Sequence, residues 1–324
     1  MKQFFFFASF VVMTMAAQAK IWRVNNNPGV VADATTAQAA HNLAAAGDTI
    51  HLEPSPTNYG SVTCTKPLVW LSIGGNLPAN PGLQASTVQA TIGSFTLNNG
   101  SSGSVVSVIS SGACNISTDS ITVQRSYFED RINISGSRSK IVITQSNCTV
   151  ISLENAQNAV VSNNIARGGV RNGTTGSAVI INNVLASESR FQNCVGILPD
   201  IYNSVFQNNI IVKGGTYNFF NSQASFNTTL DAGGLPAGNN NEFSAVMANI
   251  FVNPNGTLEN DFMLKNGSPA IGTGFGGFDR GAFGGSTPFV LAFQPAIPAI
   301  TTLSSPGASG VNSINVTFSA KSNQ

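Results

Sequence analysis

The chain has 324 residues, of which 15 are basic and 14 acidic, so its net charge is +1. Charged residues make up only 9% of the sequence and no basic stripe exists, which leaves binding to a nucleic-acid backbone without an electrostatic basis. The length suits one large domain with a substantial core.

Residues 1–19 are typical of a secretory signal peptide. Lys2 supplies the positive start, and the apolar run at 4–15 is too short to span a bilayer comfortably. Small residues at 17–19 predict cleavage after Ala19, with an uncleaved anchor as the alternative. No other apolar run approaches about 18 residues, so we expect no membrane span after signal removal. The mature protein is expected to be secreted, periplasmic or on the cell surface.

Residues 20–60 are predicted to form an N-terminal strand and a capping helix. IWRV (21–24) suits a strand, and a helix is expected at about 36–46, with Thr35 or Thr36 at its amino end and Gly47 as its left-handed stop. This helix is interpreted as a lid over the first coil of a stack. A strand at 47–54 follows.

Short strands continue through residues 61–120, with a loop at 74–84. From 121 to 212 one phrase then repeats, as in VITQSNCTVISL (142–153) and VVSNNIARGGV (160–170). The repeats are anchored on Ser126, Ser146, Asn164, Asn183 and Asn209. A period near 20 residues indicates a solenoid, whose coils bury apolar surface only by stacking.

The coils are predicted to be β rather than α. Each repeat holds Val and Ile in short runs broken by Asn, Ser, Thr and Gly, and none has a helical apolar stripe. Stacking would place Asn163–Asn164, Asn182–Asn183 and Asn208–Asn209 in ladders about 4.8 Å apart, with side-chain amides bonding between coils. The alternative role for these residues is to satisfy the backbone of turns.

Two further phrases frame the repeats. AAAGDTIHLEP (44–54) precedes them, and a weaker copy at 246–254, anchored on Asn249, leads into SPAIGTGFGGFDRGAFGG (268–285), which is expected to close the stack. Together with the repeats, these phrases resemble the secreted bacterial right-handed parallel β-helix, or pectin-lyase-like, family over residues 21–285. The resemblance implies an all-β, single-stranded right-handed parallel β-helix at 61–285. It leaves activity open, because this scaffold carries lyases, hydrolases, adhesins and structural spikes.

Residues 286–324 form a separate C-terminal tail. They contain several prolines and an alternating apolar pattern at 314–318, which predicts a Pro-rich hairpin. The tail could lie along the solenoid or contact another protein.

Four cysteines remain after signal removal: Cys64, Cys114, Cys148 and Cys194. Export permits disulfides, and four thiols allow three full pairings. Inward-facing free thiols are the alternative, since Cys packs as a small apolar residue. No C-x-x-C pair points to zinc.

Catalysis on the resembling scaffold implies clustered charges: lyases use a basic residue and calcium-binding acids, and hydrolases use paired carboxylates. Counting from the anchors places no two carboxylates in one column. It does place Arg171 and Arg190 on adjacent coils, in a column with Asn133 and Leu153. Stacked arginines can grip a carboxylate or sulfate, so Arg167, Arg171 and Arg190 are candidate contacts for an anionic glycan. Solvated arginines paired with nearby glutamates are the alternative.

The irregular segment at 216–245 supplies candidate aromatic contacts. Tyr217, Phe219 and Phe220 could stack on sugar rings, or could pack the segment onto the solenoid. The only histidines, His41 and His51, lie in the predicted cap and have no Ser or Cys partner in a nucleophile motif.

Two hypotheses follow. The sequence favours a secreted, non-catalytic β-helix that acts as a surface, adhesive or glycan-contacting module, without a cofactor and without nucleic acid. The alternative is a polysaccharide lyase or glycoside hydrolase of the pectin-lyase-like fold, and calcium enters only there. The sequence leaves the oligomeric state open.

Overall fold

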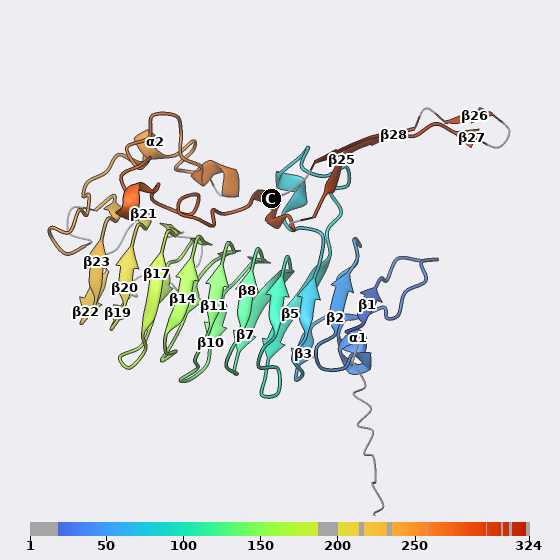
Figure 1. The fold of residues 1–324 in the computed structure, drawn as a ribbon, viewed down its shortest axis with the longest axis horizontal. Helices are drawn as coiled ribbons and strands as arrows, with labels where there is room; N and C mark the ends of the chain where they lie inside the picture. The colour runs from blue at the N-terminus through green and yellow to red at the C-terminus, as the bar shows by residue number, and fades with distance from the viewer. Residues whose placement is uncertain are drawn as a thin grey trace, which may run out of the picture.

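The protein folds as a parallel β-helix, seen here in a computed structural model (Figure 1). The structure describes residues 19–186, 200–213, 217–231, 235–256, 258–295, 297–305, 307–310 and 313–321. A regular coil contributes one short strand to each of three walls. In the described residues, neighbouring coils pair in parallel, with one irregularity of register between Leu185 and Ala186, which confirms the predicted solenoid.

The first wall contains ten strands: β1 Ile21–Val24, β2 Thr49–Leu52, β4 Val69–Leu71, β6 Val105–Ser107, β8 Thr122–Gln124, β11 Val142–Thr144, β14 Ala159–Ser162, β17 Ala178–Ile181, β20 Val205–Gln207 and β23 Gln223–Ser225. The second wall contains β9 Tyr127–Phe128, β12 Asn147–Cys148, β15 Ile165–Ala166, β18 Val184–Ala186, β21 Ile210–Lys213 and β24 Thr228–Thr229. The third wall contains β3 Val62–Cys64, β10 Ile132–Ile134, β13 Ile151–Ser152, β16 Val170–Arg171, β19 Asp200–Tyr202 and β22 Asn218–Phe220. The longer strands β5 Thr91–Leu97 and β7 Ser110–Ile116 bend from the second wall into the third.

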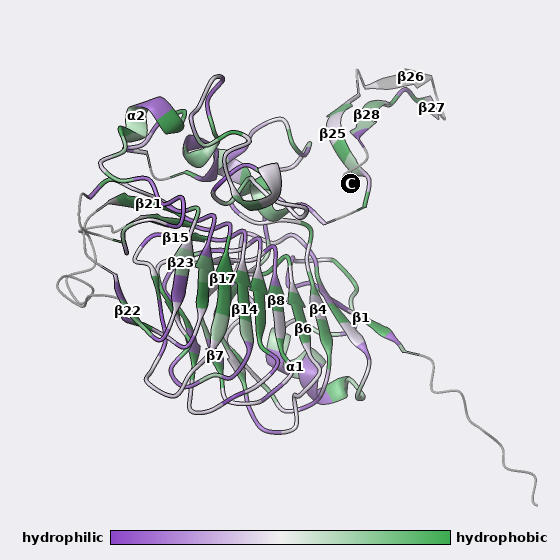
Figure 2. Ribbon diagram, turned by 60° about the vertical axis from the view of Figure 1, so that its left-hand side comes forward, coloured by the Kyte–Doolittle hydropathy of each residue, from purple (hydrophilic) through white to green (hydrophobic). Residues whose placement is uncertain are grey.

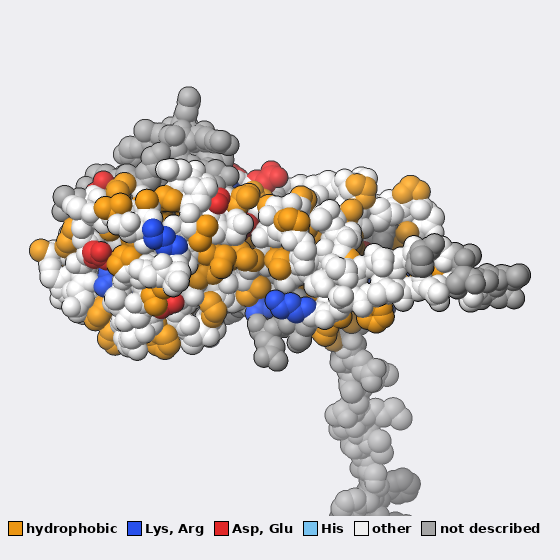
Figure 3. Space-filling view, turned by 90° about the horizontal axis from the view of Figure 1, so that it is seen from above, with side chains coloured by type: hydrophobic (Ala, Val, Ile, Leu, Met, Phe, Trp, Pro, Cys, Tyr) orange, Lys and Arg blue, Asp and Glu red, His pale blue; other side chains and the backbone are white. Residues whose placement is uncertain are grey.

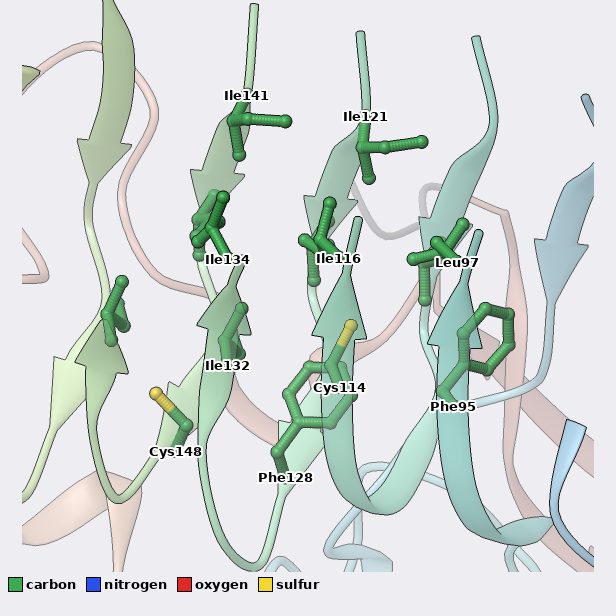
Figure 4. Close-up of a cluster of buried hydrophobic side chains, with 14 of the residues drawn as sticks. Phe95, Leu97, Cys114, Ile116, Ile121, Phe128, Ile132, Ile134, Ile141 and Cys148 are labelled. Atoms are coloured by element: carbon green, nitrogen blue, oxygen red, sulfur yellow. The ribbon is translucent and has the colours of Figure 1, made fainter. Parts of the chain in front are cut away.

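The core fills the space between the walls because alternate residues of each short strand point inward. Phe95 and Cys114 pair side by side on adjacent coils of the third wall, as do Cys114 and Ile132 (Figure 4). Green, hydrophobic strands alternate with polar turns along the stack (Figure 2). Cys64, Cys114 and Cys148 are buried free thiols, whereas Cys194 lies outside the described residues.

The corner between the first and second walls carries a buried asparagine ladder. The Oδ1 atom of Asn183 accepts the backbone N–H of Asn164 at 2.9 Å, and the Oδ1 atom of Asn209 accepts that of Asn183 at 2.9 Å. All three residues are fully buried. Asn227 continues the ladder by accepting the N–H of Asn209. The predicted stacking of Asn164, Asn183 and Asn209 is therefore confirmed.

The asparagines one residue earlier have a different role. Asn163, Asn182 and Asn208 have φ angles of 56°, 55° and 55°, a left-handed conformation that asparagine tolerates better than most residues. Their side chains point away from the core, toward a segment that returns from the C-terminal side.

Helix α1, Ala37–Leu43, lies against the first coils, next to β1, β2 and β3. Thr36 caps it by accepting the N–H of Ala39, as predicted. Its buried face includes Ala37, Ala40 and His41, while Leu43 at its end is 52% exposed. The helix ends before the predicted boundary because Ala44 is already extended.

The strand ladder ends near Thr229, with one further bridge between Thr228 and Glu242. The prediction that 246–254 forms another coil is wrong, because it contains helix α2, Met247–Ile250. Residues 245–295, here called the strap, leave the stack and run back over it (Figure 1). Its other helical turns are η2 Glu259–Phe262, η3 Phe275–Gly277 and η4 Leu291–Phe293; one more turn, η1 Leu77–Ala79, lies in the early loop.

The strap covers the outer face of the second wall and makes a second apolar core with it. Ile165, Val184 and Ile210 from three coils pack against strap residues that include Phe251, Phe262, Phe289 and Phe293. From this side, charged side chains are sparse among hydrophobic and uncharged ones (Figure 3).

Polar bonds also fasten the strap to the left-handed corner. The side-chain amide of Asn163 donates to the carbonyls of Ala282 and Gly284, and that of Asn182 donates to the carbonyl of Asp279.

Beyond the strap, the tail forms antiparallel β25 Ala299–Ser304 and β28 Thr317–Lys321, with β26 Ala308–Gly310 and β27 Ser313–Ile314. Within the described parts of the chain, no helix has the length and apolar character needed to cross a bilayer.

Candidate functional site

The outer face of the third wall carries a column of polar side chains. In register from coil to coil, the outward residues are Thr63, Thr96, Asn115, Asn133, Ser152 and Arg171. The column continues into β19, because the N–H of Asn172 donates to the carbonyl of Asp200 at 3.2 Å. In the parallel pattern of this wall, that bond aligns Arg171 with Asp200.

Strands β19 and β22 end the column with an aromatic pair. Their register pairs Asp200 with Asn218 and Tyr202 with Phe220. The Tyr202 and Phe220 rings stack with centroids 4.5 Å apart and an angle of 12° between their planes. Phe220 is 46% exposed, so much of this apolar ring faces solvent. Exposed aromatics are uncommon on a wall otherwise lined by polar residues, and they often mark contact sites.

Hydrogen bonds position the polar groups beside these rings. Asn218 donates to Oδ1 of Asp200 at 2.9 Å, and the Tyr202 hydroxyl donates to Oδ2 of Asp200 at 3.4 Å. Loss of solvent around the hydroxyl, and then the nearby Asp200 charge, raise the pKa of Tyr202. The phenol therefore stays protonated and can donate a hydrogen bond.

Arg171 lies at the other side of Asp200. Its Nε donates to Oγ of Ser152 at 3.3 Å, which directs the side chain along the column. We call Arg171, Asp200, Tyr202, Asn218 and Phe220 the third-wall patch. It combines an apolar ring with a cationic donor, an anionic acceptor and an amide, which is the chemistry that sugar rings and their hydroxyl groups require.

The other predicted contacts lie elsewhere. Tyr217 and Phe219 point inward and pack on Phe206, with centroid distances of 5.3 Å each. Burial raises the pKa of Tyr217 far above its ordinary value. Tyr217 and Phe219 therefore pack their segment onto the solenoid, which was the alternative to sugar stacking, whereas the Phe220 ring remains exposed.

Arg167 lies near the strap rather than in the patch. Its guanidinium carbon is 5.9 Å from the centre of the Tyr127 ring, and Tyr127 in turn packs on Phe293 of the strap. Arg190 lies outside the described residues. The column predicted through Leu153 is wrong, because Ser152 stands between Asn133 and Arg171 and Leu153 is buried.

Asp200, Tyr202 and Asn218 were missed by counting from the anchors. The 26-residue step from Asn183 to Asn209 concealed a complete third-wall strand. A second repeat would have found them: DIYNS (200–204) recurs as NFFNS (218–222), 18 residues later.

The chain was compared with known proteins in three ways, and no family model, no curated protein and no solved structure matches it. Across the described residues, no group of three or more His, Cys, Asp or Glu side chains is arranged to hold a metal ion.

Proposed function

We propose that this protein is a secreted, non-catalytic β-helix that binds a polysaccharide through the third-wall patch. The observation that carries the proposal is the half-exposed Phe220 ring, stacked on Tyr202 and flanked by hydrogen-bonding side chains. A ring already held by its neighbour loses little conformational freedom when a ligand stacks on it, so more of the contact energy appears as affinity.

The polar column gives the ligand a direction. Asn115, Asn133 and Ser152 precede the patch on successive coils, each about 4.8 Å from the next. An extended glycan chain lying along the solenoid axis would meet the amides of Asn115 and Asn133 before it reaches Arg171, whereas Ser152 is buried and its hydroxyl accepts a hydrogen bond from Arg171. Arg171 and Asp200 add one charge of each sign, so the patch tolerates both neutral sugars and sugars that carry a carboxylate.

The test is a glycan array followed by affinity measurements on the polysaccharides that bind. Phe220→Ala and Arg171→Ala are each expected to weaken binding at least tenfold, equivalent to about 1.4 kcal/mol. Phe278→Ala and Arg131→Ala are matched controls, because Phe278 is a comparably exposed ring on the strap and Arg131 is an exposed arginine before β10. Unchanged affinity in both patch variants would refute the proposal.

Two measurements test the remaining parts. Incubating the protein with each bound polysaccharide and assaying for new reducing ends or unsaturated products separates binding from cleavage; turnover would favour the lyase or hydrolase alternative. Amino-terminal sequencing of exported protein is expected to begin at Lys20.

A further inference from the structure

The tail hairpin projects beyond the body of the solenoid (Figures 1 and 2). Strands β25 and β28 pair antiparallel, and the carbonyl of Ile300 at their base accepts the N–H of Ala85 at 2.7 Å. This bond ties the hairpin to the early loop. A two-stranded hairpin is marginally stable on its own in water, so contacts beyond its own pairing matter for its order.

The two faces of the hairpin differ in chemistry. Leu303 lies opposite Phe318, and Ile300 lies opposite Ala320, which forms an apolar face. Thr302 lies opposite Ser319 on the other face. The register shift between Ile300 and Thr302 lets Ile300 share the face of Leu303.

The apolar face is open to solvent to an unusual degree. Ile300 is 47% exposed, Val316 51%, Leu303 61% and Phe318 61%. Leu303 and Ile300 also line a cavity of about 320 Å³ at the base of the hairpin, together with Ile73 and Pro298. Exposed contiguous apolar surface of this kind marks an interaction site.

Charge and area together indicate what kind of partner fits. Lys321 is the only charged residue between 297 and 321, and it lies opposite Ala299 at the end of the pair. The apolar face is therefore uncharged and meets no repulsion from an identical face. Taking about 150–200 Å² for a large apolar residue, the four exposed fractions give roughly 330–440 Å² on each copy, or about 660–880 Å² for two. That total is below the roughly 1,200 Å² of a stable interface, so the contact would be weak and transient.

We propose that the apolar face of this hairpin is a self-association surface, on which the hairpin of a second copy of the chain packs face to face. Two such hairpins form a four-stranded, two-layer sandwich with its sheets about 10 Å apart. A two-fold axis relates the copies, so each contact occurs twice. The resulting dimer is reversible and leaves the third-wall patch of both copies free.

The test is sedimentation velocity of the full chain over roughly 1–100 μM, where a weak dimer of this size is expected to change its population. Phe318→Lys places a charge in the interface and is expected to weaken dimerisation at least tenfold. Thr302→Lys adds the same charge to the opposite face and is expected to leave dimerisation unchanged. This comparison also controls for association through the apolar residues 4–15, which both variants retain.

A second measurement tests the same interface independently, in case Phe318→Lys disturbs the hairpin. Leu303→Cys is expected to form an intermolecular disulfide under mild oxidation, whereas Thr302→Cys is not. A monomer throughout the concentration range, equal effects of the two lysine variants, or equal cross-linking of the two cysteine variants would each overturn the proposal. So would a different protein occupying this face while the chain itself stays monomeric.

Discussion

Replacing Asn183 with alanine should strongly destabilise the protein, because this residue lies in the middle of the buried ladder. Its amide donates to the carbonyls of Val161 and Ile181 at 3.0 Å each and to Oδ1 of Asn209 at 2.9 Å. Its Oδ1 accepts the backbone N–H of Asn164. The substitution leaves that buried N–H and two carbonyls without these partners. At about 1 kcal/mol for each of these four hydrogen bonds, the total is about 4 kcal/mol.

Guanidinium-induced unfolding followed by far-ultraviolet circular dichroism measures this loss. Asn255→Ala is the control, since Asn255 is exposed on the strap, and it should change the free energy of unfolding by less than about 0.5 kcal/mol. A loss below about 1 kcal/mol for Asn183→Ala would show that the ladder bonds contribute little beyond what water provides.

Arg280→Met should loosen the strap, because the Arg280 guanidinium donates to Oγ1 of Thr228 at 2.9 Å and lies 3.5 Å from the Glu242 carboxylate. The free energy of unfolding should fall by about 3 kcal/mol, and proteolysis within the strap should become faster. An unchanged rate of cleavage would contradict this prediction. Acid should weaken the packing of the N-terminal helix α1 through His41. Its Nε2 accepts the N–H of Thr65, and its Nδ1 lies within hydrogen-bond distance of Gln38 and Asn42. The Lys66 ammonium group bonds to the His41 carbonyl. Burial lowers the pKa of His41 below 6.5, so its contribution to stability is complete above pH 6.5 and is lost as pH falls through the lower folded pKa. The melting temperature should therefore fall more steeply from pH 7 to pH 5 in the native chain than in His41→Gln, and parallel curves would refute this role.

The sequence predicted the solenoid because its signal is local and repeated. Val-rich runs, turn residues and a near-constant period each point to stacked β-coils, and the buried Asn164, Asn183 and Asn209 follow from that register. The strand at 21–24 and the Thr36 cap were likewise set by neighbouring residues.

The candidate site was less predictable because it depends on register across coils of unequal length. The bend after Ser146 is one residue shorter than the bends in the coils on either side, which moved Ser152 into the column in place of Leu153. Arg171 and Phe220 were singled out, but Asp200, which aligns with Arg171, and Tyr202, which stacks on Phe220, were not, because an insertion separates their coil from the preceding repeat.

The strap was missed for another reason. Its sequence resembles a closing coil, yet Phe251, Phe262, Phe289 and Phe293 bury themselves against the outside of the second wall. Nothing in the spacing of those aromatic residues shows which surface they will cover. That information lies in the outward positions of Ile165, Val184 and Ile210, which a β-helix without a strap would leave exposed to water.

The path of the strap also constrains how the chain reaches its native state. Coils can add one after another as the polypeptide emerges, since each needs only its predecessor. The strap is translated after the coils, yet Glu259 accepts hydrogen bonds from Asn76 and Asn147, more than a hundred residues upstream. The coils that carry Ile165, Val184 and Ile210 therefore leave these outward side chains uncovered until the strap has been made. A chain that stopped before residue 245 would keep its stacked coils but expose the apolar outer face of the second wall. Such exposed apolar surface makes it a substrate for chaperones and proteases.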